Sequence, residues 1–541
     1  MPLNKIDLPE RWVLPTALFF LIALLIILEL PMLSFSNGLL IYPQDDGYIR
    51  LAIARNLANT GNWGLSPHEF SNASSSILYP LLLAACFKLF GVQPVIPLLV
   101  NLGAAVGLII TLDRWLRKQG LIPFHQLLIL LAIIYLTPLH IMVVYGMEHT
   151  LQIWLCMIFL IVFSEWMSQE RNAEGKYPGA PWTLYLFGIL ITSIRYEGLF
   201  FVIVAFIILL QRRQWVSAGI MIATALLPLA LFGIYSMAHG SYFIPNSILV
   251  KAVPLPLNME TIGSFIKESI INKLLYPYPT SGNVAANRLL ILLPLVYWYY
   301  ISIPDTNKRY QYIMCFLLAV TLMHLIFANA GFFYRYEAYL IACGLMIPAV
   351  LLVKQETLLF SIKNAVGRSI LAWTVIFLLY PFFSRSWAAY QEAEDGFLHE
   401  YLYNYQATRF LHTYYDNATA VMDELGMASF LSTGKKLDVV TGIAYTEMTR
   451  VRVEGSTPVG YFNYLIKKEK VEIALIAEKK YHPLLKQGWI KVAAWHTDIK
   501  RPFGESELDI YAVNPAAVYS LRTNLKKFQT TMPEGIRVDY F

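Results

Sequence analysis

Two adjacent carboxylates, Asp45 and Asp46, stand directly before a helical pattern of apolar residues, in the segment after the first long apolar run. The helix dipole stabilises the ionised form of a carboxylate at a helix start, and an ionised carboxylate can accept a proton as a general base. Adjacent helical residues point about 100° apart, so only one of the two can face a substrate. We expect Asp45 to project into a cavity and Asp46 to cap or orient. The alternative is that one of them is merely a helix cap.

Three cations, Arg195, Lys251 and Arg335, stand at or near the ends of other apolar runs. Guanidinium and ammonium groups form charge-assisted hydrogen bonds with phosphate, so these residues are candidates for holding a lipid phosphate. We expect Lys251 or Arg335 to lie within about 10 Å, one Debye length, of the acidic pair. The alternatives are a structural ion pair between Arg195 and Glu197, and cations that merely reach toward the membrane surface.

Other polar residues near apolar-run ends are candidates for substrate contacts: Glu148, His149, Glu197, Asn246 and Tyr334. Glu148 and His149 begin a helical segment, and a capped helix start is the simpler explanation for them. The sequence has no HxxxH motif and no paired His–carboxylate spacing that would indicate a dedicated metal site. No metal ligands are therefore predicted, and a divalent cation is left open as a cofactor.

The elements that position these residues are membrane helices. Of the 541 residues, 57% are hydrophobic and 14% are charged, whereas a soluble domain has about 25% charged residues. This composition excludes a disordered chain and an ordinary soluble enzyme, and the net charge of +6 is too small to indicate a nucleic-acid partner. All four cysteines lie in apolar runs, which predicts buried thiols without disulfide bonds.

Apolar runs of about the length needed to cross a bilayer predict eleven spans, although the pair around Arg195 is short. They lie near residues 12–33, 94–113, 126–145, 148–165, 181–194, 197–211, 215–238, 288–304, 311–328, 336–353 and 369–385. The apolar stretch from Ser76 to Phe90 is short and contains Pro80, so we interpret it as an element on the outer surface. Every inner loop then carries at least two basic residues, in agreement with the positive-inside rule.

With eleven spans and an inner N-terminus, the acidic pair, the candidate cations and the tail all fall on the outer side. We therefore predict a membrane domain over 1–385, with a first outer loop over 34–91, and a soluble α/β domain over 386–541. Strands are expected at Leu437–Val440, Val471–Ala477, Trp489–Trp495 and Leu508–Val513, and helices at Gln406–Tyr414 and Val459–Lys468.

An ordered set of segments resembles the GT-C superfamily of integral-membrane glycosyltransferases. The set is DDGYIRLAIARNLANTGNWGLSP, SNASSSILYPLLLAACFKLFG, GMEHTLQIWL, SIRYEGLFF, FIPNSILVKA and FYRYEAYL, followed in the tail by DELGMASFLSTGKKLDVVTGI. It looks closest to the arabinofuranosyltransferase-like branch. The polar, Gly-containing stretch GYTN that often follows the loop in this branch is replaced here by FSNASSS.

The resemblance implies a bacterial cytoplasmic (inner) membrane enzyme whose active site and C-terminal domain face outward. It also implies a polyprenyl-phosphate sugar donor and a catalytic carboxylate at Asp45 or Asp46. The expected reaction is an inverting transfer of a pentose such as arabinofuranose to a hydroxyl of a glycan or protein. The alternatives are transfer of mannose or aminoarabinose, a lipid-linked-substrate flippase or other transporter, and a binding or scaffold protein. A transporter more often carries its charges near the midplane, whereas here they gather at one face.

Overall fold

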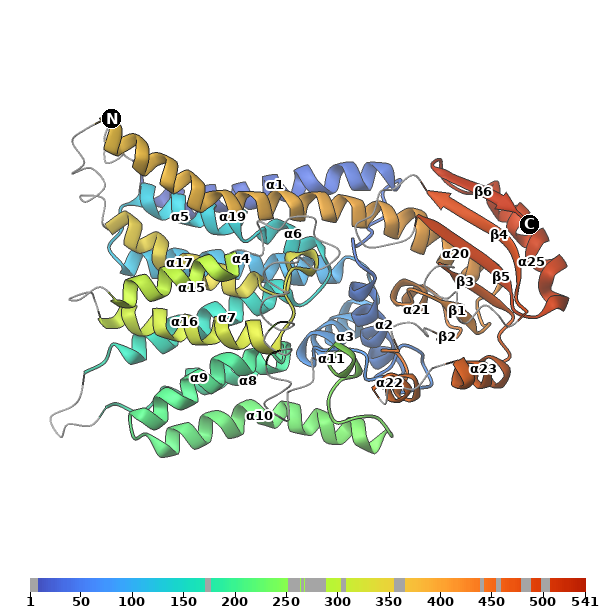
Figure 1. Ribbon diagram of the computed structural model, residues 1–541, viewed down its shortest axis with the longest axis horizontal. Coiled ribbons are helices and arrows are strands. Elements are labelled where there is room, and N and C mark those ends of the chain that lie inside the picture. Colours follow the sequence, from blue (N-terminus) through green and yellow to red (C-terminus); the bar gives the residue numbers. More distant parts are fainter. Residues whose placement is uncertain are drawn as a thin grey trace.

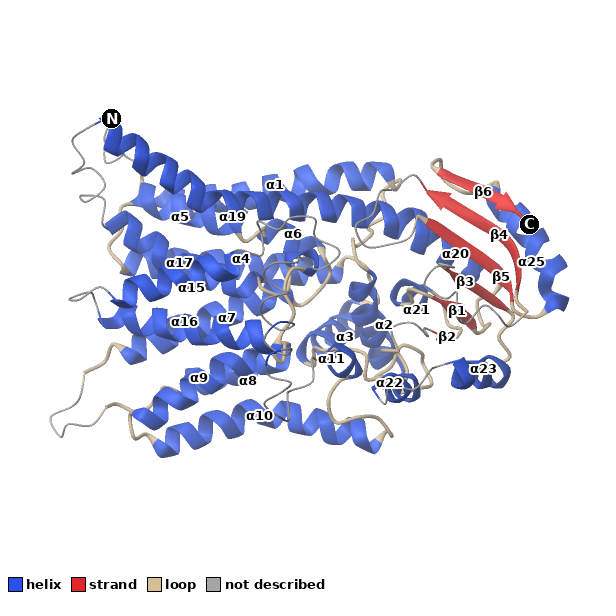
Figure 2. Ribbon diagram, in the orientation of Figure 1, coloured by secondary structure: helices blue, strands red, loops and turns tan. Residues whose placement is uncertain are grey.

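The computed structural model describes residues 8–170, 177–251, 263, 267, 289–302, 308–354, 365–437, 442–453, 459–477, 488–497 and 506–541. It consists of a helical bundle and a C-terminal domain built on a β-sheet (Figures 1 and 2). The turn between α9 and α10, which carries Arg212 and Arg213, lies at the end of the bundle away from the C-terminal domain (Figure 1). This arrangement agrees with the expected placement of the tail opposite these residues. Which end faces outward stays a prediction.

Among the described residues, five helices are long and apolar enough to cross a membrane: α1 (Val13–Phe35), α4 (Ile96–Lys118), α7 (His149–Met167), α10 (Trp215–Ala238) and α16 (Lys308–Phe327). The bundle also contains shorter helices, namely α5 (Pro123–Leu136), α6 (Leu139–Val144), α8 (Trp182–Ile194), α9 (Gly198–Gln211), α15 (Leu289–Ser302) and α17 (Ala338–Lys354). The span expected over 126–145 is divided into α5 and α6 at Pro138, because proline has no N–H to continue the helix. The count of eleven spans stays a prediction.

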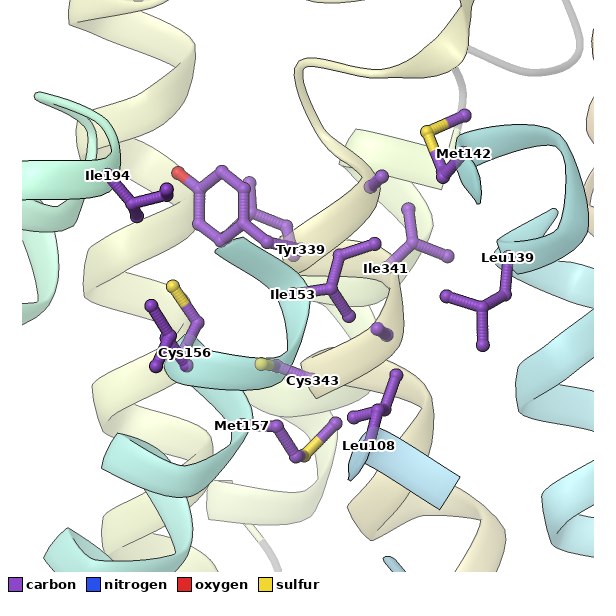
Figure 3. Packing of buried hydrophobic residues seen from close by; sticks show 14 of the residues in the cluster. Leu108, Leu139, Met142, Ile153, Cys156, Met157, Ile194, Tyr339, Ile341 and Cys343 are labelled. Atoms are coloured by element: carbon purple, nitrogen blue, oxygen red, sulfur yellow. The ribbon is translucent and has the colours of Figure 1, made fainter. Parts of the chain in front are cut away.

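Close packing of apolar side chains fixes the helices around the centre of the bundle. Figure 3 shows Ile153 and Met157 of α7 beside Ile341 and Cys343 of α17, with Leu108 of α4 nearby. All five side chains are fully buried. Cys156 and Cys343 are buried free thiols, as expected. The expectation is wrong for Cys86, which is half-buried, and for Cys315, which is exposed, because an apolar helix can turn such a residue outward. A core of this density holds the ends of α7 and α17 at fixed positions.

Three short helices lie at the end of the bundle next to the C-terminal domain: α2 (Asp45–Thr60), α3 (Leu78–Phe90) and α11 (Asn246–Lys251) (Figure 1). Helix α2 ends at Gly61, whose φ of 74° lies in the left-handed region that glycine adopts readily. Helix α3 has 13 residues, about 20 Å of helix, which is less than the roughly 30 Å of a hydrocarbon core. It packs against α2.

Helix α19 (Ala365–His399) connects the bundle to the C-terminal domain. It continues as a π-helix, η5 (Glu400–Tyr405), and then as α20 (Gln406–Tyr414). The boundary that the sequence placed at residue 385 therefore falls inside a continuous helix. Charged side chains become frequent where this helix leaves the apolar part of the bundle. The change in composition that suggested the boundary therefore marks this exit and does not mark the end of the helix.

The C-terminal sheet has the strand order β2-β1-β3-β5-β4-β6. Strand β1 is parallel to β2 and β3, and the remaining neighbours are antiparallel. The strands are β1 (Ala420–Met422), β2 (Lys436–Leu437), β3 (Ile473–Ile476), β4 (Ile490–Thr497), β5 (Glu507–Ala512) and β6 (Ile536–Tyr540). The helices of the C-terminal domain include α21 (Gly426–Leu431), α22 (Thr446–Val453), α23 (Val459–Lys468) and α25 (Val518–Gln529).

The expected helices α20 and α23 and the strands β3, β4 and β5 are confirmed. Of the strand expected over Leu437–Val440, only Leu437 falls among the described residues, as the end of β2. Strands β1 and β6 and helix α25 were not predicted. Strand β1 has three residues, and its extended form depends on partners on both sides rather than on its own sequence.

Candidate active site

Asp45 holds the start of α2 against the C-terminal domain. Its carboxylate oxygens accept hydrogen bonds from the backbone N–H groups of Gly426 and Met427, at 2.6 and 2.7 Å, in the first turn of α21. A Cβ atom on Gly426 would lie 2.3 Å from the Asp45 carbonyl oxygen, so this approach needs glycine. Burial and the Glu424 carboxylate raise the pKa of Asp45, and the two N–H donors oppose that rise.

This placement corrects the expectation that Asp45 projects into the cavity. The first N–H groups of α21 lack acceptors within their own helix, and the Asp45 carboxylate supplies them. The side chain of Asp46 points in a different direction from that of Asp45. Asp46, rather than Asp45, therefore lines the cavity at the end of the bundle.

Asp46 forms an ion pair with Arg335. Arg335 is 1% exposed and also donates a hydrogen bond to Gln44, the residue before α2. Its guanidinium carbon lies 4.7 Å from the ring centre of Phe332 and 5.2 Å from that of Tyr336. Arg335 thus lies within the expected distance of the acidic pair. Aromatic rings on a guanidinium fix its plane and therefore the direction of its hydrogen bonds.

A chain of ion pairs continues from α2 across the bundle. The Glu148 carboxylate accepts from Arg50 Nε at 3.2 Å and from Arg195 Nη1 at 2.8 Å. Arg195 Nη2 lies 2.6 Å from Glu197, and its Nη1 lies 3.3 Å from His149 Nε2. Glu148 is fully buried, so it can hold both guanidinium groups in place without competition from water.

A second buried pair shapes the loop that presents Arg335. Arg385 on α19 lies 3.1 Å from Glu337 and also donates to the Tyr334 carbonyl oxygen. The other Glu337 oxygen accepts from the backbone N–H of Gly331 at 2.9 Å. Both ends of this loop are therefore tied to one carboxylate. Removing one partner of such a buried pair is costly, so the pair fixes the position of Arg335.

The cavity has a volume of about 260 Å³. Three guanidinium groups (Arg50, Arg195 and Arg335) and two carboxylates (Asp46 and Glu197) line it. Uncharged residues complete the lining: Ile49, Ala73, Ser75, Met147, Tyr196, Leu199, Phe200, Ser247, Ile248, Phe327, Ala328, Asn329, Tyr336 and Ile443. Glu148, behind the lining, pairs with Arg50 and Arg195, so the three guanidinium groups are balanced by three carboxylates. The site therefore combines paired charges, including the 27% exposed carboxylate of Asp46, with apolar walls.

Several predicted site residues lie outside the cavity lining. Asn246 donates from its side chain to the Ile443 carbonyl oxygen at 3.1 Å, which joins α11 to the C-terminal domain. Tyr334 packs beside Arg385, and His149 lies behind Arg195. Lys251 ends α11, and its side chain is outside the described residues.

Sequence reasoning missed Arg50, Tyr336 and Asn329 as cavity residues. Arg50 follows Asp46 by one helical turn, so the i,i+4 spacing was an available signal. A group of possible metal ligands was also missed. Within the described ranges, His399, Glu400 and Glu424 bring one ligand atom each within 4.8 Å of the others.

No protein-family model matches the chain, and no curated protein matches its sequence. Among solved structures, it is similar to the oligosaccharyltransferase of Archaeoglobus fulgidus in the apo form. The TM-score is 0.51 at 11% identity, over 95% of this chain and 75% of that one. It is also similar to ArnT from Cupriavidus metallidurans in the apo state, with a TM-score of 0.50 at 12% identity, over 92% of this chain and 98% of that one.

The ArnT structure bound to undecaprenyl phosphate gives a TM-score of 0.49 at 13% identity, over 92% of this chain and 98% of that chain. The chain thus shares its fold with the two apo structures, and a bundle of apolar helices with a C-terminal sheet domain is confirmed at that level. Membership of the GT-C superfamily stays a prediction. The arabinofuranosyltransferase-like branch stays a prediction.

Proposed function

We propose that this chain is a membrane glycosyltransferase that moves a sugar from a polyprenyl-phosphate donor to an acceptor hydroxyl. One observation carries the proposal: a cavity at one end of the bundle is lined by three guanidinium groups and by the carboxylates of Asp46 and Glu197, of which Asp46 is the more exposed. The shared fold permits this activity but does not by itself establish it.

The guanidinium groups suit the phosphate of the donor. Arg335 presents a rigid fork of N–H donors, and Arg195 lines the same cavity. The terminal nitrogens of Arg335 contact Gln44, Met147, Asp46 and Tyr336, so a phosphate oxygen would share or replace one of these partners when the donor binds. As the sugar–phosphate bond breaks, negative charge grows on the leaving phosphate, and fixed cations stabilise it.

The proton of the acceptor goes to Asp46. The acceptor oxygen attacks the anomeric carbon, its proton passes to the Asp46 carboxylate, and polyprenyl phosphate leaves with the electrons of the broken C–O bond. Attack from the face opposite the phosphate inverts the anomeric configuration. Asp45 is less suited to this role because both of its oxygens already accept backbone hydrogen bonds.

The sugar, the acceptor and the membrane are proposed from the sequence resemblance. A pentose such as arabinofuranose is preferred, with mannose or aminoarabinose as alternatives, and a surface glycan or protein as acceptor. The cavity and the C-terminal domain would face outward from the bacterial inner membrane. The C-terminal domain would help to bind the acceptor, since Ile443, at the base of that domain, lines the cavity.

The test uses the full chain in lipid nanodiscs. Polyprenyl phosphates carrying arabinofuranose, mannose or aminoarabinose are supplied with a soluble alkyl glycoside, and released polyprenyl phosphate and new glycoside are measured. We expect turnover with at least one donor, and competition by unglycosylated polyprenyl phosphate. Movement of intact donor across a liposome bilayer without cleavage would contradict the proposal and favour a flippase. Failure to bind polyprenyl phosphate better than phosphatidylglycerol would also contradict it.

A further inference from the structure

Three side chains with metal-binding atoms converge where the bundle meets the C-terminal domain. His399 is the last residue of α19, Glu400 is the first residue of η5, and Glu424 lies between β1 and α21. One ligand atom of each lies within 4.8 Å of the other two. Nε2 of His399 lies 3.9 Å from a Glu424 carboxylate oxygen.

Neighbouring residues hold these groups in a converging arrangement. The Asn404 side-chain amide donates to Glu400 at 2.8 Å and to Glu424 at 2.5 Å, so one nitrogen fixes both carboxylates. The His399 ring stacks on Tyr403, with ring centres 4.4 Å apart. Hydrogen bonding and stacking of this kind orient the ligands of protein metal sites.

The burial of the three side chains differs in a way that suits an ion. His399 and Glu400 are 2% and 1% exposed, whereas the Glu424 side chain is 23% exposed. The cluster is therefore enclosed on the helix side and reachable by solvent on the loop side. A pair of neighbouring carboxylates in a largely buried place is unfavourable unless a cation or a proton reduces their repulsion.

We propose that His399, Glu400 and Glu424 form a binding site for one divalent transition-metal ion, for which Zn²⁺ is the best match. One imidazole nitrogen and two carboxylate oxygens are a donor set that Zn²⁺ accepts, and a fourth position would be filled by water. The proposal does not depend on glycosyl transfer, because none of the three residues lines the cavity with Asp46.

The position of the site suggests what the ion would do. Glu424 precedes Gly426 by two residues, and the Gly426 N–H is a donor to Asp45. An ion at this place would join the end of the helix α19 to the loop that holds the start of α2. A π-helix, which is rare and often found at functional sites, begins at Glu400.

The experiment measures zinc binding to the purified full chain in detergent after removal of metal by a chelator. Titration against a chromophoric zinc chelator gives affinity and stoichiometry. We expect one Zn²⁺ per chain and a rise in melting temperature with Zn²⁺. His399→Gln and Glu424→Gln should each lower the affinity at least about a hundredfold, since even residues that only support metal ligands contribute about 10–100-fold.

The matched control is His412→Gln. His412 also lies beside a carboxylate, Asp416, at 2.8 Å, but this pair is at the surface and has no third ligand in the described part of the chain. It should leave the affinity unchanged. If His399→Gln fails to fold, Glu424→Gln and the wild-type stoichiometry decide. Absence of a zinc equivalent in the wild-type protein, or unchanged affinity in the folded variants, would overturn the proposal.

Discussion

Two adjacent carboxylates on α2 serve two regions of different character. Asp45 lies in the junction with the C-terminal domain, where its carboxylate accepts from two backbone N–H groups of α21. Asp46 lies in the cavity and meets the guanidinium of Arg335. The rotation of about 100° between adjacent helical residues directs one side chain to the domain junction and the other to the cavity. Residue type alone therefore does not identify a catalytic group, because the partners of its side chain decide the role.

Asp46→Asn removes the charge of the carboxylate in the cavity and should have the largest effect. The amide is nearly isosteric but cannot accept the acceptor proton, so the transfer rate should fall by roughly 10²–10⁴-fold. The release of polyprenyl phosphate in nanodiscs measures it. Asp416→Asn, in the C-terminal domain, is the matched control and should transfer normally. Transfer at the wild-type rate by Asp46→Asn would remove this carboxylate from the mechanism.

Arg335→Gln should have the next largest effect. A hydrogen bond to a charged group contributes about 1.5–3 kcal/mol, so polyprenyl phosphate should bind roughly 10–100-fold more weakly. Arg335→Lys should recover part of the loss because it restores the charge but not the planar fork. Arg114→Gln, exposed near the C-terminal end of α4, is the control. Equal binding by wild type and Arg335→Gln would place the phosphate elsewhere.

Asp45→Ala tests the junction side. Two N–H groups of α21 lose their acceptor, and losses of this kind cost about 1–2 kcal/mol of stability. We expect faster hydrogen exchange at residues 426–431 and a lower melting temperature, measured by mass spectrometry and by thermal unfolding. Transfer by the folded fraction should fall far less than in Asp46→Asn. The opposite ranking of the two variants would restore Asp45 as the base.

Glu69→Gln removes an exposed ion pair at the edge of the junction and should have the smallest effect. Glu69 pairs with Lys435 at 2.8 Å, but its side chain is 48% exposed. An exposed ion pair contributes about 0–1 kcal/mol, so the melting temperature should barely change and the small change should shrink further in high salt. A fall in melting temperature as large as that of Asp45→Ala would mean that the Glu69–Lys435 ion pair stabilises the junction as much as the contact at α21 does.

Local patterns in the sequence were sufficient for many elements. The expected bounds of α20 and α23 agree with the structure, because an amphipathic period of 3.6 residues needs no distant partner to be recognised. The ends of α8, α9 and α10 also agree to within one residue. Strand β1 could not be found in this way, because its three residues are extended only through pairing with β2 and β3.

The site was predictable in composition but not in orientation. Arg335 could be associated with the acidic pair because both stand near the ends of apolar runs that the same membrane surface aligns. The different orientations of Asp45 and Asp46 depend on α21, which follows them by about 380 residues and whose position no local pattern indicates. The proximity of His399 and Glu424 could not be predicted for the same reason, because sequence motifs cover short spacings and these residues are brought together only by the fold.

Helix α19 has 35 residues and is about 50 Å long, and it passes from the bundle into the C-terminal domain without a break. Such a continuous helix fixes the orientation of the two parts that it connects, whereas a hinge would let it vary. Each added residue would turn the C-terminal domain by about 100° and raise it by about 1.5 Å relative to the bundle. The number of residues between Arg385 and His399 therefore sets the rotation of the C-terminal domain about the helix axis, and with it the contact between α21 and Asp45. An insertion or deletion in this interval would keep the contact only if its length were close to a whole number of helical turns.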